Sequence, residues 1–330
     1  MTLGLKTQIL PADAATVAKA AQRLKEGGLV AFPTETVYGL GADATKAEAI
    51  ARLYEAKGRP LFNPLIAHVG SFEAARRIAR FDAIAVKLAE AFWPGPLTLV
   101  LPKTLNCAVA DLATAGLDTV AVRLPIHAIA RSILDAFGGP VVAPSANLSG
   151  HVSPTSAEHV AADLSGRIDL IVDGGPVTVG VESTIVGCFD TPMLLRPGGL
   201  PREAIERVLG QQLVRPPQDL ALETSQPLAP GMLASHYAPR TPVRLNAKEV
   251  RAGEALLAFG PDRISGTDRA LAVMNLSARG DLNEAATHLF GYLRALDAIG
   301  ASTIAVAPVP HHGLGEAIND RLRRAGIGHE

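Results

Sequence analysis

Residues 32–68 constrain what this chain can fold into more than any other stretch. A short apolar run at 29–32 predicts a buried strand, and Pro33 ends it. Thr34 and Thr36 follow at once, so a turn rich in hydroxyl groups comes directly after the strand. After a helical pattern come two cations, an amide and an imidazole, each near glycine or proline: Lys57, Arg59, Asn63 and His68. This grouping suits an anionic ligand better than it suits a hydrophobic core.

The composition fits two compact domains with an aliphatic interior. The chain has 330 residues, more than one domain usually contains. Hydrophobic residues make up 48% of it and aromatic residues only 4%, so aliphatic side chains must form the core. The formal net charge of −1 argues against attraction of the whole chain to nucleic acid, although it permits a local basic pocket.

Cysteine use and the lack of long apolar runs predict a cytoplasmic protein. Cys107 and Cys188 have neither CxxC spacing nor that of a metal site, which favours reduced thiols over a disulfide. Residues 1–10 lack the apolar centre of a signal peptide, and no apolar run is long enough for a membrane span. We therefore expect neither a signal peptide nor contact with a membrane.

Strand and helix patterns mix along residues 13–210 without strict alternation. Strands are expected at 29–32, 64–69, 97–101, 119–123, 140–143, 169–172, 183–187 and 193–196. Helices are expected at 13–26, 72–80, 83–92, 125–137 and 201–209, with two more opened by capping boxes at Thr45 with Glu48 and at Thr155 with Glu158. This mixture predicts an α/β fold with a mixed, twisted sheet and flanking helices.

The pattern changes at residues 211–242, which contain several prolines and no periodic run. So long a connection is either a slack spacer or a functional segment. Beyond it, strands are expected at 256–259, 270–274 and 303–307, and helices at 314–325 and from a cap at Asn283 to Gly300. The sequence therefore predicts a first domain at 13–210, a linker at 211–242, and a smaller, Rossmann-like parallel α/β domain at 243–330.

Polar side chains lie at the ends of the predicted strands, where ligands bind in open α/β sheets. They are Thr34, Thr36, His68, Arg123, Ser145, Asn147, Ser183 and Arg196. Together with Lys57 and Arg59, the two arginines would bring four positive charges, which suit a polyphosphate or a carboxylate. The sequence has no P-loop and no HExxH or GxSxG motif, and no GxGxxG follows a strand, so the standard sites with those signatures are not expected.

Each of these residues alone also permits a purely structural interpretation. Lys57 could stabilise a helix C-terminus, and Thr36 or Ser183 could be an ordinary turn hydroxyl. His68 could be a hydrogen-bonded core histidine. The pair at 311–312 lacks the third ligand that a metal site needs. The joint pattern, and no single residue, indicates a site.

Many short motifs in register resemble one known family. The segments that look like the YrdC-like domain are 33–40, 57–60, 63–65, 93–98, 118–123, 144–150, 180–185 and 195–198. The runs 229–232, 235–239 and 313–322 are similar to those of the long, two-domain threonylcarbamoyl-AMP synthases. The likeness extends over about residues 13–326, and its specificity comes from the number of motifs in order.

The resemblance implies a nucleotidyltransferase. L-threonine, bicarbonate or CO2, and ATP would give L-threonylcarbamoyl-AMP and pyrophosphate, the first step of threonylcarbamoyladenosine modification in tRNAs that read ANN codons. Mg²⁺ is expected with ATP, held by substrate and water and by no protein ligand. The implied partners are a transferase complex that takes the product and, through a weak contact, RNA.

The resemblance also assigns residues. The family's catalytic quartet maps to Lys57, Arg59, Ser145 and Asn147. Threonine recognition maps to Thr36, His68, Arg123, Ala143 and Ser183. ATP contacts map to Arg59, Asn63, Thr119, Ser145, Ser153, Arg196 and Tyr237.

Tyr237 lies in the linker, which in the family folds back over the site; a proline-rich spacer with one exposed aromatic is the alternative interpretation. At Leu233 and Ala234 this sequence departs from the cation and aromatic that many members carry, so contacts there would differ.

Two other functions fit the same resemblance. One is a non-catalytic RNA-binding module of the same fold, against which the near-neutral charge weighs. The other is a carbamoyl-adenylate enzyme such as the carbamoyl-transfer factors of hydrogenase maturation. Those proteins carry acylphosphatase and zinc-finger segments, which this sequence lacks.

Overall fold

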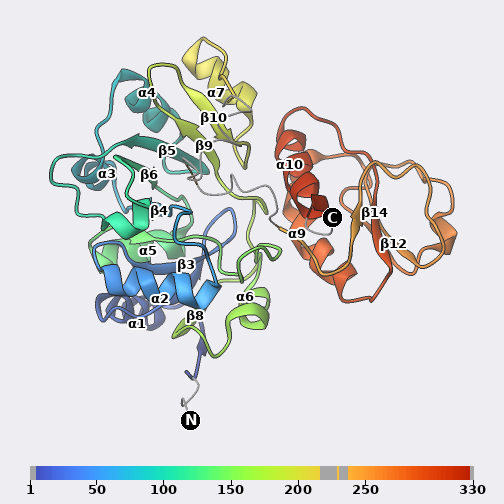
Figure 1. Ribbon diagram of the computed structural model, residues 1–330, viewed down its shortest axis with the longest axis horizontal. Helices are drawn as coiled ribbons and strands as arrows, with labels where there is room; N and C mark the ends of the chain where they lie inside the picture. The colour runs from blue at the N-terminus through green and yellow to red at the C-terminus, as the bar shows by residue number, and fades with distance from the viewer. Residues whose placement is uncertain (1–4, 216–228, 230–236, 328–330) are drawn as a thin grey trace.

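The computed structural model describes residues 5–215, 229 and 237–327. Figure 1 shows two domains side by side, with helices α9 and α10 of the second domain on the side that faces the first. The linker predicted at 211–242 falls largely outside the described residues. No helix in the described ranges is long and apolar enough to cross a membrane.

A mixed sheet forms the centre of the first domain. Within the described residues it has ten strands in the order β1-β8-β2-β3-β7-β4-β6-β5-β9-β10. The strands are β1 Gln8–Pro11, β2 Val30–Pro33, β3 Tyr38–Asp43, β4 Ile66–His68, β5 Leu97–Pro102, β6 Thr119–Arg123, β7 Val141–Val142, β8 Leu170–Asp173, β9 Thr184–Gly187 and β10 Met193–Arg196. Parallel pairs such as β4 with β6 stand beside antiparallel pairs such as β5 with β6. The predicted mixed sheet is therefore confirmed.

Helices cover both faces of this sheet. They are α1 Ala14–Lys25, α2 Ala47–Lys57, α3 Phe72–Ile78, α4 Ala83–Phe92, α5 Ala128–Phe137, α6 Ala157–Leu164 and α7 Arg202–Leu209, with a 3₁₀ turn at Asp111–Thr114. Val30 and Phe32 pack in a core that α1 and α5 share, whereas Leu29 and Ala31 belong to a larger core with α2 and α6. Neighbouring side chains of a strand point to opposite faces, so β2 is buried on both sides and reads as a continuous apolar run.

Strand β3 is the main element that sequence patterns miss. It forms an antiparallel hairpin with β2, in the stretch interpreted above as a turn. Gly39 and Gly41 interrupt its apolar pattern. A Cβ at Gly41 would lie 2.7 Å from the Phe32 ring, so only glycine leaves room for that ring against the face of β3.

The predicted helix starts are wrong in four places. Thr45 does not cap α2, because its hydroxyl bonds the Asp43 carboxylate at 2.7 Å and Lys46 takes the N-cap position. Ser156, not Thr155, caps α6, since its extended backbone lets the side chain accept from the amide of His159. Asp281 caps α9 in place of Asn283, and α5 begins at Ala128 after an extended segment at Pro125.

The second domain is a smaller parallel α/β unit, as predicted. Its sheet has the order β11-β14-β12-β13 within the described residues, and every pair in it is parallel. The elements are β11 Val243–Arg244, β12 Glu254–Ala258, β13 Val273–Asn275, β14 Thr303–Val306, α9 Leu282–Asp297 and α10 Leu314–Ile327, with a 3₁₀ turn at Thr267–Arg269.

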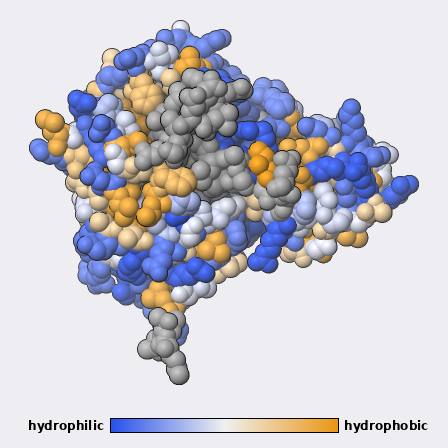
Figure 2. All heavy atoms as spheres, viewed as in Figure 1, coloured by the Kyte–Doolittle hydropathy of each residue, from blue (hydrophilic) through white to orange (hydrophobic). Residues whose placement is uncertain are grey.

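One apolar core joins the two domains. Val37, Val152 and Val181 of the first domain pack in the same cluster as Leu289 and Phe290 of α9. In the view of Figure 2, hydrophilic residues cover most of the outer part of the second domain, and hydrophobic ones gather toward the first. Burial of these side chains stabilises the docked arrangement by the hydrophobic effect.

Candidate active site

A pocket with an empty volume of about 500 Å³, including its open mouth, lies at the strand ends of the first domain, beside the second. It is lined by Thr36, Val37, Arg59, Ile66, His68, Arg123, Ala143, Pro144, Ser145, Glu182, Ser183, Arg196 and Tyr237. The parallel strands β4 and β6 end side by side, which places His68 opposite Arg123 in the register. Nine of the residues suggested by the sequence therefore meet in one place: Thr36, Arg59, His68, Arg123, Ala143, Ser145, Ser183, Arg196 and Tyr237.

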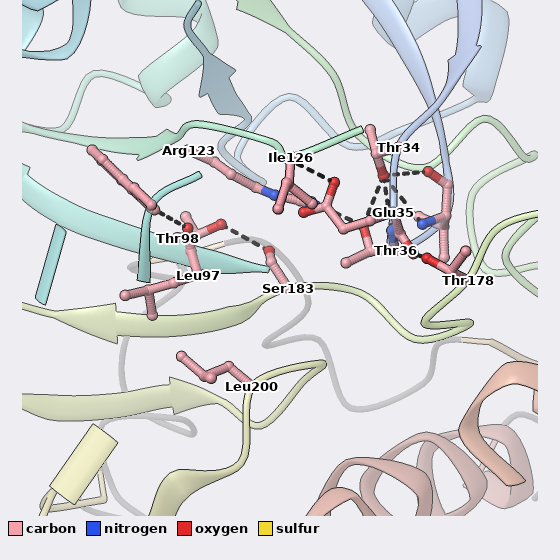
Figure 3. Close-up of polar contacts among 12 residues, drawn as sticks. Thr34, Glu35, Thr36, Leu97, Thr98, Arg123, Ile126, Thr178, Ser183 and Leu200 are labelled. Carbon is pink, nitrogen blue, oxygen red and sulfur yellow. Dashed lines mark hydrogen bonds and ion pairs between the residues drawn. The ribbon is translucent and has the colours of Figure 1, made fainter. Parts of the chain in front are cut away.

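Arg123 links the β2–β3 turn to the end of β6. Its Nη2 donates to the Glu35 carboxylate at 2.5 Å, and its Nη1 donates to the Thr36 hydroxyl at 2.9 Å (Figure 3). Thr34 and Thr36 share a hydrogen bond of 2.8 Å in the same group. The Nε of Arg123 is buried and has no partner among the described residues. The guanidinium is thus charge-balanced and fixed, with one donor unused.

His68 presents a neutral imidazole. Burial, together with the positive charge of Arg123, lowers the pKa of His68 to about 3. Its Nδ1 lies 3.2 Å from the carbonyl oxygen of Ile66. A carbonyl only accepts, so this contact requires the proton on Nδ1 and leaves Nε2 as an acceptor.

Ser183 and Arg196 form the wall made by β9 and β10. The Ser183 hydroxyl lies 2.8 Å from the Thr98 hydroxyl, a contact drawn in Figure 3. Arg196 donates from Nη2 to the carbonyl oxygen of Ser183 at 2.9 Å and to its hydroxyl at 3.2 Å. Burial lowers the pKa of Arg196, which marks a cation that would gain from an anionic partner.

Lys57 and Arg59 lie at the end of α2, and their side chains contact different groups. Gly58 takes a left-handed conformation with φ 60°, and this ends the helix between them. Arg59 donates to the carbonyl oxygens of Asn63 and Pro64, and burial lowers its pKa to about 10. The pocket is lined by Arg59 and not by Lys57.

Lys57 instead supports the loop that carries Ser145 and Asn147. Its ammonium donates to the carbonyl oxygens of both residues, at 2.6 and 2.5 Å. Burial and the charge of Arg59 lower the pKa of Lys57 well below its usual value. Its predicted phosphate contact stays a prediction, and the observed contacts indicate a role in shaping the loop.

Four other predicted residues lie outside the lining set. The side-chain amide of Asn63 is buried, and neither its nitrogen nor its oxygen has a partner among the described residues. Asn147 donates to the carbonyl oxygens of Leu148 and His151. The Ser153 hydroxyl bonds Glu182, and Thr119 begins β6 at the end opposite Arg123. The Oδ1 of Asn147 is also buried without a partner among the described residues. Unpaired buried amide atoms are costly, so Asn63 and Asn147 point to a ligand group more strongly than Ser153 and Thr119 do.

Tyr237 is the residue of the predicted lid that lines the pocket. Its ring stacks on Phe290 with centroids 5.6 Å apart, and it lines the pocket with 1% of its surface exposed. It is buried, so the alternative of an exposed spacer aromatic is wrong for this residue. Leu233 and Ala234 lie outside the described residues, as does most of the linker.

Sequence reasoning missed two buried carboxylates, Glu35 and Glu182. Each directly precedes a predicted site residue, Thr36 or Ser183. Glu35 bonds Arg123, and Glu182 lines the pocket. A charged residue next to an apolar strand is the sequence signal that could have identified them. A site predicted to bind anions gives no reason to expect carboxylates in its wall.

The comparisons with known proteins identify the family of this chain. Residues 22–198 match a family model described as "Telomere recombination", and residues 200–326 match one described as "Threonylcarbamoyl-AMP synthase, C-terminal domain". The chain is 46% identical over 325 residues to the threonylcarbamoyl-AMP synthase of Pyrococcus abyssi, covering 93% of this chain and 92% of the relative. To that of Bacillus subtilis it is 42% identical over 325 residues, covering 94% and 93%.

Solved structures show the same likeness. The crystal structure of P. abyssi Sua5 complexed with L-threonine is similar with a TM-score of 0.87 and 40% identity, covering 97% of each chain. The structure of E. coli YciO is similar in fold alone, with a TM-score of 0.53 and 23% identity, covering 59% of this chain and 96% of YciO. These matches confirm the predicted fold, family and synthase function, and they do not favour a non-catalytic RNA-binding module. The chain therefore belongs to the threonylcarbamoyl-AMP synthase family.

Proposed function

We propose that this chain makes L-threonylcarbamoyl-AMP and pyrophosphate from L-threonine, bicarbonate or CO2, and ATP. The observation that carries the proposal is the convergence of Arg59, Arg123 and Arg196 on one pocket, each with no more than 9% of its surface exposed. Burying three cations together is unfavourable unless anionic groups meet them. Glu35 and Glu182 balance part of this charge, and the remainder suits a substrate carboxylate and phosphates.

Threonine is proposed to bind at the end of the pocket formed by Thr36, His68, Arg123 and Ser183, beside Ala143. The free Nε of Arg123 is a donor for the amino-acid carboxylate. The neutral imidazole of His68 adds no charge that would repel the substrate's ammonium group. The hydroxyls of Thr36 and Ser183 can each donate or accept, which suits the threonine side chain. P. abyssi Sua5, a relative of similar structure, was solved with L-threonine, which supports threonine as a ligand of this chain.

ATP is proposed to bind toward Arg59, Ser145, Arg196 and Tyr237. Asn63 would give its unpaired amide to the nucleotide, and Ser153 and Thr119 would complete the ATP contacts predicted from the sequence. Lys57 and Asn147 keep the catalytic role predicted for them. We propose that they act by holding the loop around Ser145 in place.

The reaction is an adenylyl transfer, which places the chain among the nucleotidyltransferases. An oxygen of the carbamate group of N-carboxy-threonine forms a bond to the α-phosphorus of ATP. The bond from that phosphorus to the oxygen bridging to the β-phosphate breaks, and pyrophosphate leaves with the electron pair. Such a step needs in-line placement and cations around the phosphates, and it needs no protein nucleophile.

Mg²⁺ is proposed to accompany ATP. The described part of the pocket offers cations to phosphates, and its lining carboxylate, Glu182, already pairs with Arg321. No group of three or more metal-ligating side chains lies together in the described ranges. The phosphates and water would therefore hold the ion, which would neutralise phosphate charge.

The product is a reactive acyl-phosphate anhydride, so another protein must take it up before water hydrolyses it. We propose a tRNA-modifying transferase complex as that partner, with at most a weak contact of this chain to RNA. A cytoplasmic location stays a prediction from cysteine use; Cys107 and Cys188 are both free thiols.

Pyrophosphate release tests the proposal. The purified chain would be incubated with ATP, Mg²⁺, L-threonine and bicarbonate, and then with each omitted in turn. Release that needs all the substrates, together with the adenylate mass by mass spectrometry, is the expected result. Release with carbamoyl phosphate in place of threonine would support the other carbamoyl-adenylate chemistry, and tRNA binding without any turnover would support the RNA-binding module.

A further inference from the structure

Arg321 of α10 reaches from the second domain into the wall of the pocket. It is fully buried, with 0% of its surface exposed. Its Nε donates to the Glu182 carboxylate at 2.8 Å, and its Nη1 donates to the carbonyl oxygen of Pro197 at 3.0 Å and to Asp320 at 2.8 Å. Its guanidinium carbon lies 5.0 Å from the centroid of the Tyr237 ring.

Two of these neighbours line the pocket. Glu182 directly precedes Ser183 and also accepts a hydrogen bond from Ser153. The ring of Tyr237 contacts the guanidinium of Arg321 and also stacks on the ring of Phe290. Arg321 is therefore one contact away from the pocket at two separate points, although it does not line the pocket itself.

The charge of Arg321 matters because Glu182 also interacts with Arg196. Burial raises the pKa of Glu182, but the charges of Arg321 and Arg196 outweigh this effect and keep the carboxylate ionised. Without Arg321, a buried carboxylate would be left with Arg196 as its main cation. Arg196 would then be drawn toward an internal anion instead of a substrate phosphate.

We propose that Arg321 is a positioning residue by which the second domain completes the pocket. It neutralises Glu182, which leaves Arg196 available to the substrate, and it fixes the ring of Tyr237 at the pocket wall. This inference rests on the proposed function. It gives the second domain a role in the reaction: α10 acts through Glu182 and Tyr237 and touches no substrate.

Other contacts hold the domains together at a distance from the pocket. Arg202 pairs with Glu316 of α10, with Nε 3.1 Å from the carboxylate. Arg294 of α9 pairs with Asp163 at 2.8 Å. None of these four side chains is among the pocket-lining residues. Arg202→Ala therefore weakens docking without touching the pocket, and it serves as the matched control.

A second control lies on α10 itself. Arg323 is 61% exposed in its side chain and pairs with Asp320 at 3.2 Å. Arg323→Ala removes one positive charge from the same helix, as Arg321→Met does, but at a position that faces solvent.

The experiment compares Arg321→Met and Arg321→Lys with these controls in the full chain. We expect Arg321→Met to lower kcat/KM for ATP by about 30-fold and to weaken ATP binding by calorimetry, with each control within about threefold of the parent. Arg321→Lys keeps the charge but loses the planar fork, so a partial loss of about fivefold is expected. Melting temperatures separate these effects from unfolding.

A double variant tests the neutralising role directly. Glu182→Gln in the Arg321→Met background removes the anion that the arginine balanced, so it should recover activity relative to Arg321→Met alone. No recovery, or equal losses in Arg321→Met and Arg202→Ala, would overturn the inference.

Should Arg321→Met fail to fold, Arg321→Gln takes its place, and a kcat/KM for ATP within about threefold of the parent in that neutral variant would also overturn the inference. If the parent chain itself releases no pyrophosphate, the proposed function fails instead, and the ATP calorimetry of the same variants still tests Arg321.

Discussion

The two sheets of this chain differ in the side chains that lie at their strand ends. In the first domain, the pocket gathers buried Arg123, Arg196 and His68 at strand ends. The second domain also has a hollow, at the carboxyl ends of its parallel strands. It is lined by Leu256, Ala258, Pro261, Asp262, Arg263, Ile264, Thr267, Val273, Asn275 and Ala307. Both hollows occupy the place where α/β sheets bind ligands, so position alone does not separate them.

The difference lies in how their polar groups are satisfied. In the second hollow, Thr267 donates to the carbonyl oxygen of Ile264, Asn275 donates to that of Gly260, and Arg263 is exposed to solvent. At the first pocket, the Nε of Arg123 is buried without a partner among the described residues, and so is the side-chain amide of Asn63, which lies outside the lining. An unpaired buried donor in a pocket wall carries a cost that a ligand can remove, and of the two hollows the first has such a donor among its described lining residues.

The largest expected effect is at Arg196. Arg196→Met should lower turnover by about a thousandfold, because a buried cation facing the phosphates would be lost. Pyrophosphate release at saturating substrates measures it, with Arg263→Met in the second hollow as the matched control. If turnover in Arg196→Met falls by less than about fivefold, the first hollow would not differ from the second in its importance for the reaction.

A smaller, more selective effect is expected at Arg123. In Arg123→Lys, a single ammonium group replaces the planar guanidinium. It cannot bond Glu35 and Thr36 and also supply the donor that Nε provides. KM for threonine should therefore rise by about a hundredfold. KM for ATP should change much less, and steady-state kinetics with each substrate varied in turn separates the two. Equal rises in both KM values would contradict the assignment of Arg123 to threonine.

His68 predicts a dependence of stability on pH. The pKa of His68 is about 3 in the folded chain and about 6.5 in the unfolded chain, so between these two pH values the unfolded chain binds a proton that the folded chain does not. The stability from the neutral imidazole is fully present above about pH 6.5 and is lost as the pH falls toward 3, by at most about 1.4 kcal/mol per pH unit. Urea unfolding of the parent and of His68→Gln at several pH values measures it. An unchanged slope would show that the folded chain tolerates the imidazolium.

The smallest effect is expected in the second hollow. Thr267→Val removes a hydroxyl whose bond is to the local backbone, so activity should stay within about twofold and stability within about 1 kcal/mol. Kinetics and thermal unfolding check both. A tenfold loss of activity would make this hollow part of the reaction and remove the contrast drawn above.

Much of the pocket could be predicted from the sequence, because polar residues that directly follow short apolar runs stand out. Thr36, His68 and Arg123 lie at or just beyond the end of such runs, whereas Ser183 begins one. The apolar pattern of strand β3 is interrupted by Gly39 and Gly41, and the packing of Phe32 requires the second of them. Arg321 could not be found, because its effect depends on how α10 docks on a domain that precedes it by more than a hundred residues.

The sheet order also has a consequence for folding kinetics. β1 pairs with β8, so Gln8 aligns with Leu170, and β8 also lies against β2. This edge of the sheet therefore cannot form until segments far apart in the chain have met, and that search is slow. Until then, the apolar edges of β1 and β2 stay unpaired, and they are the surfaces on which a folding chain would aggregate or recruit a chaperone.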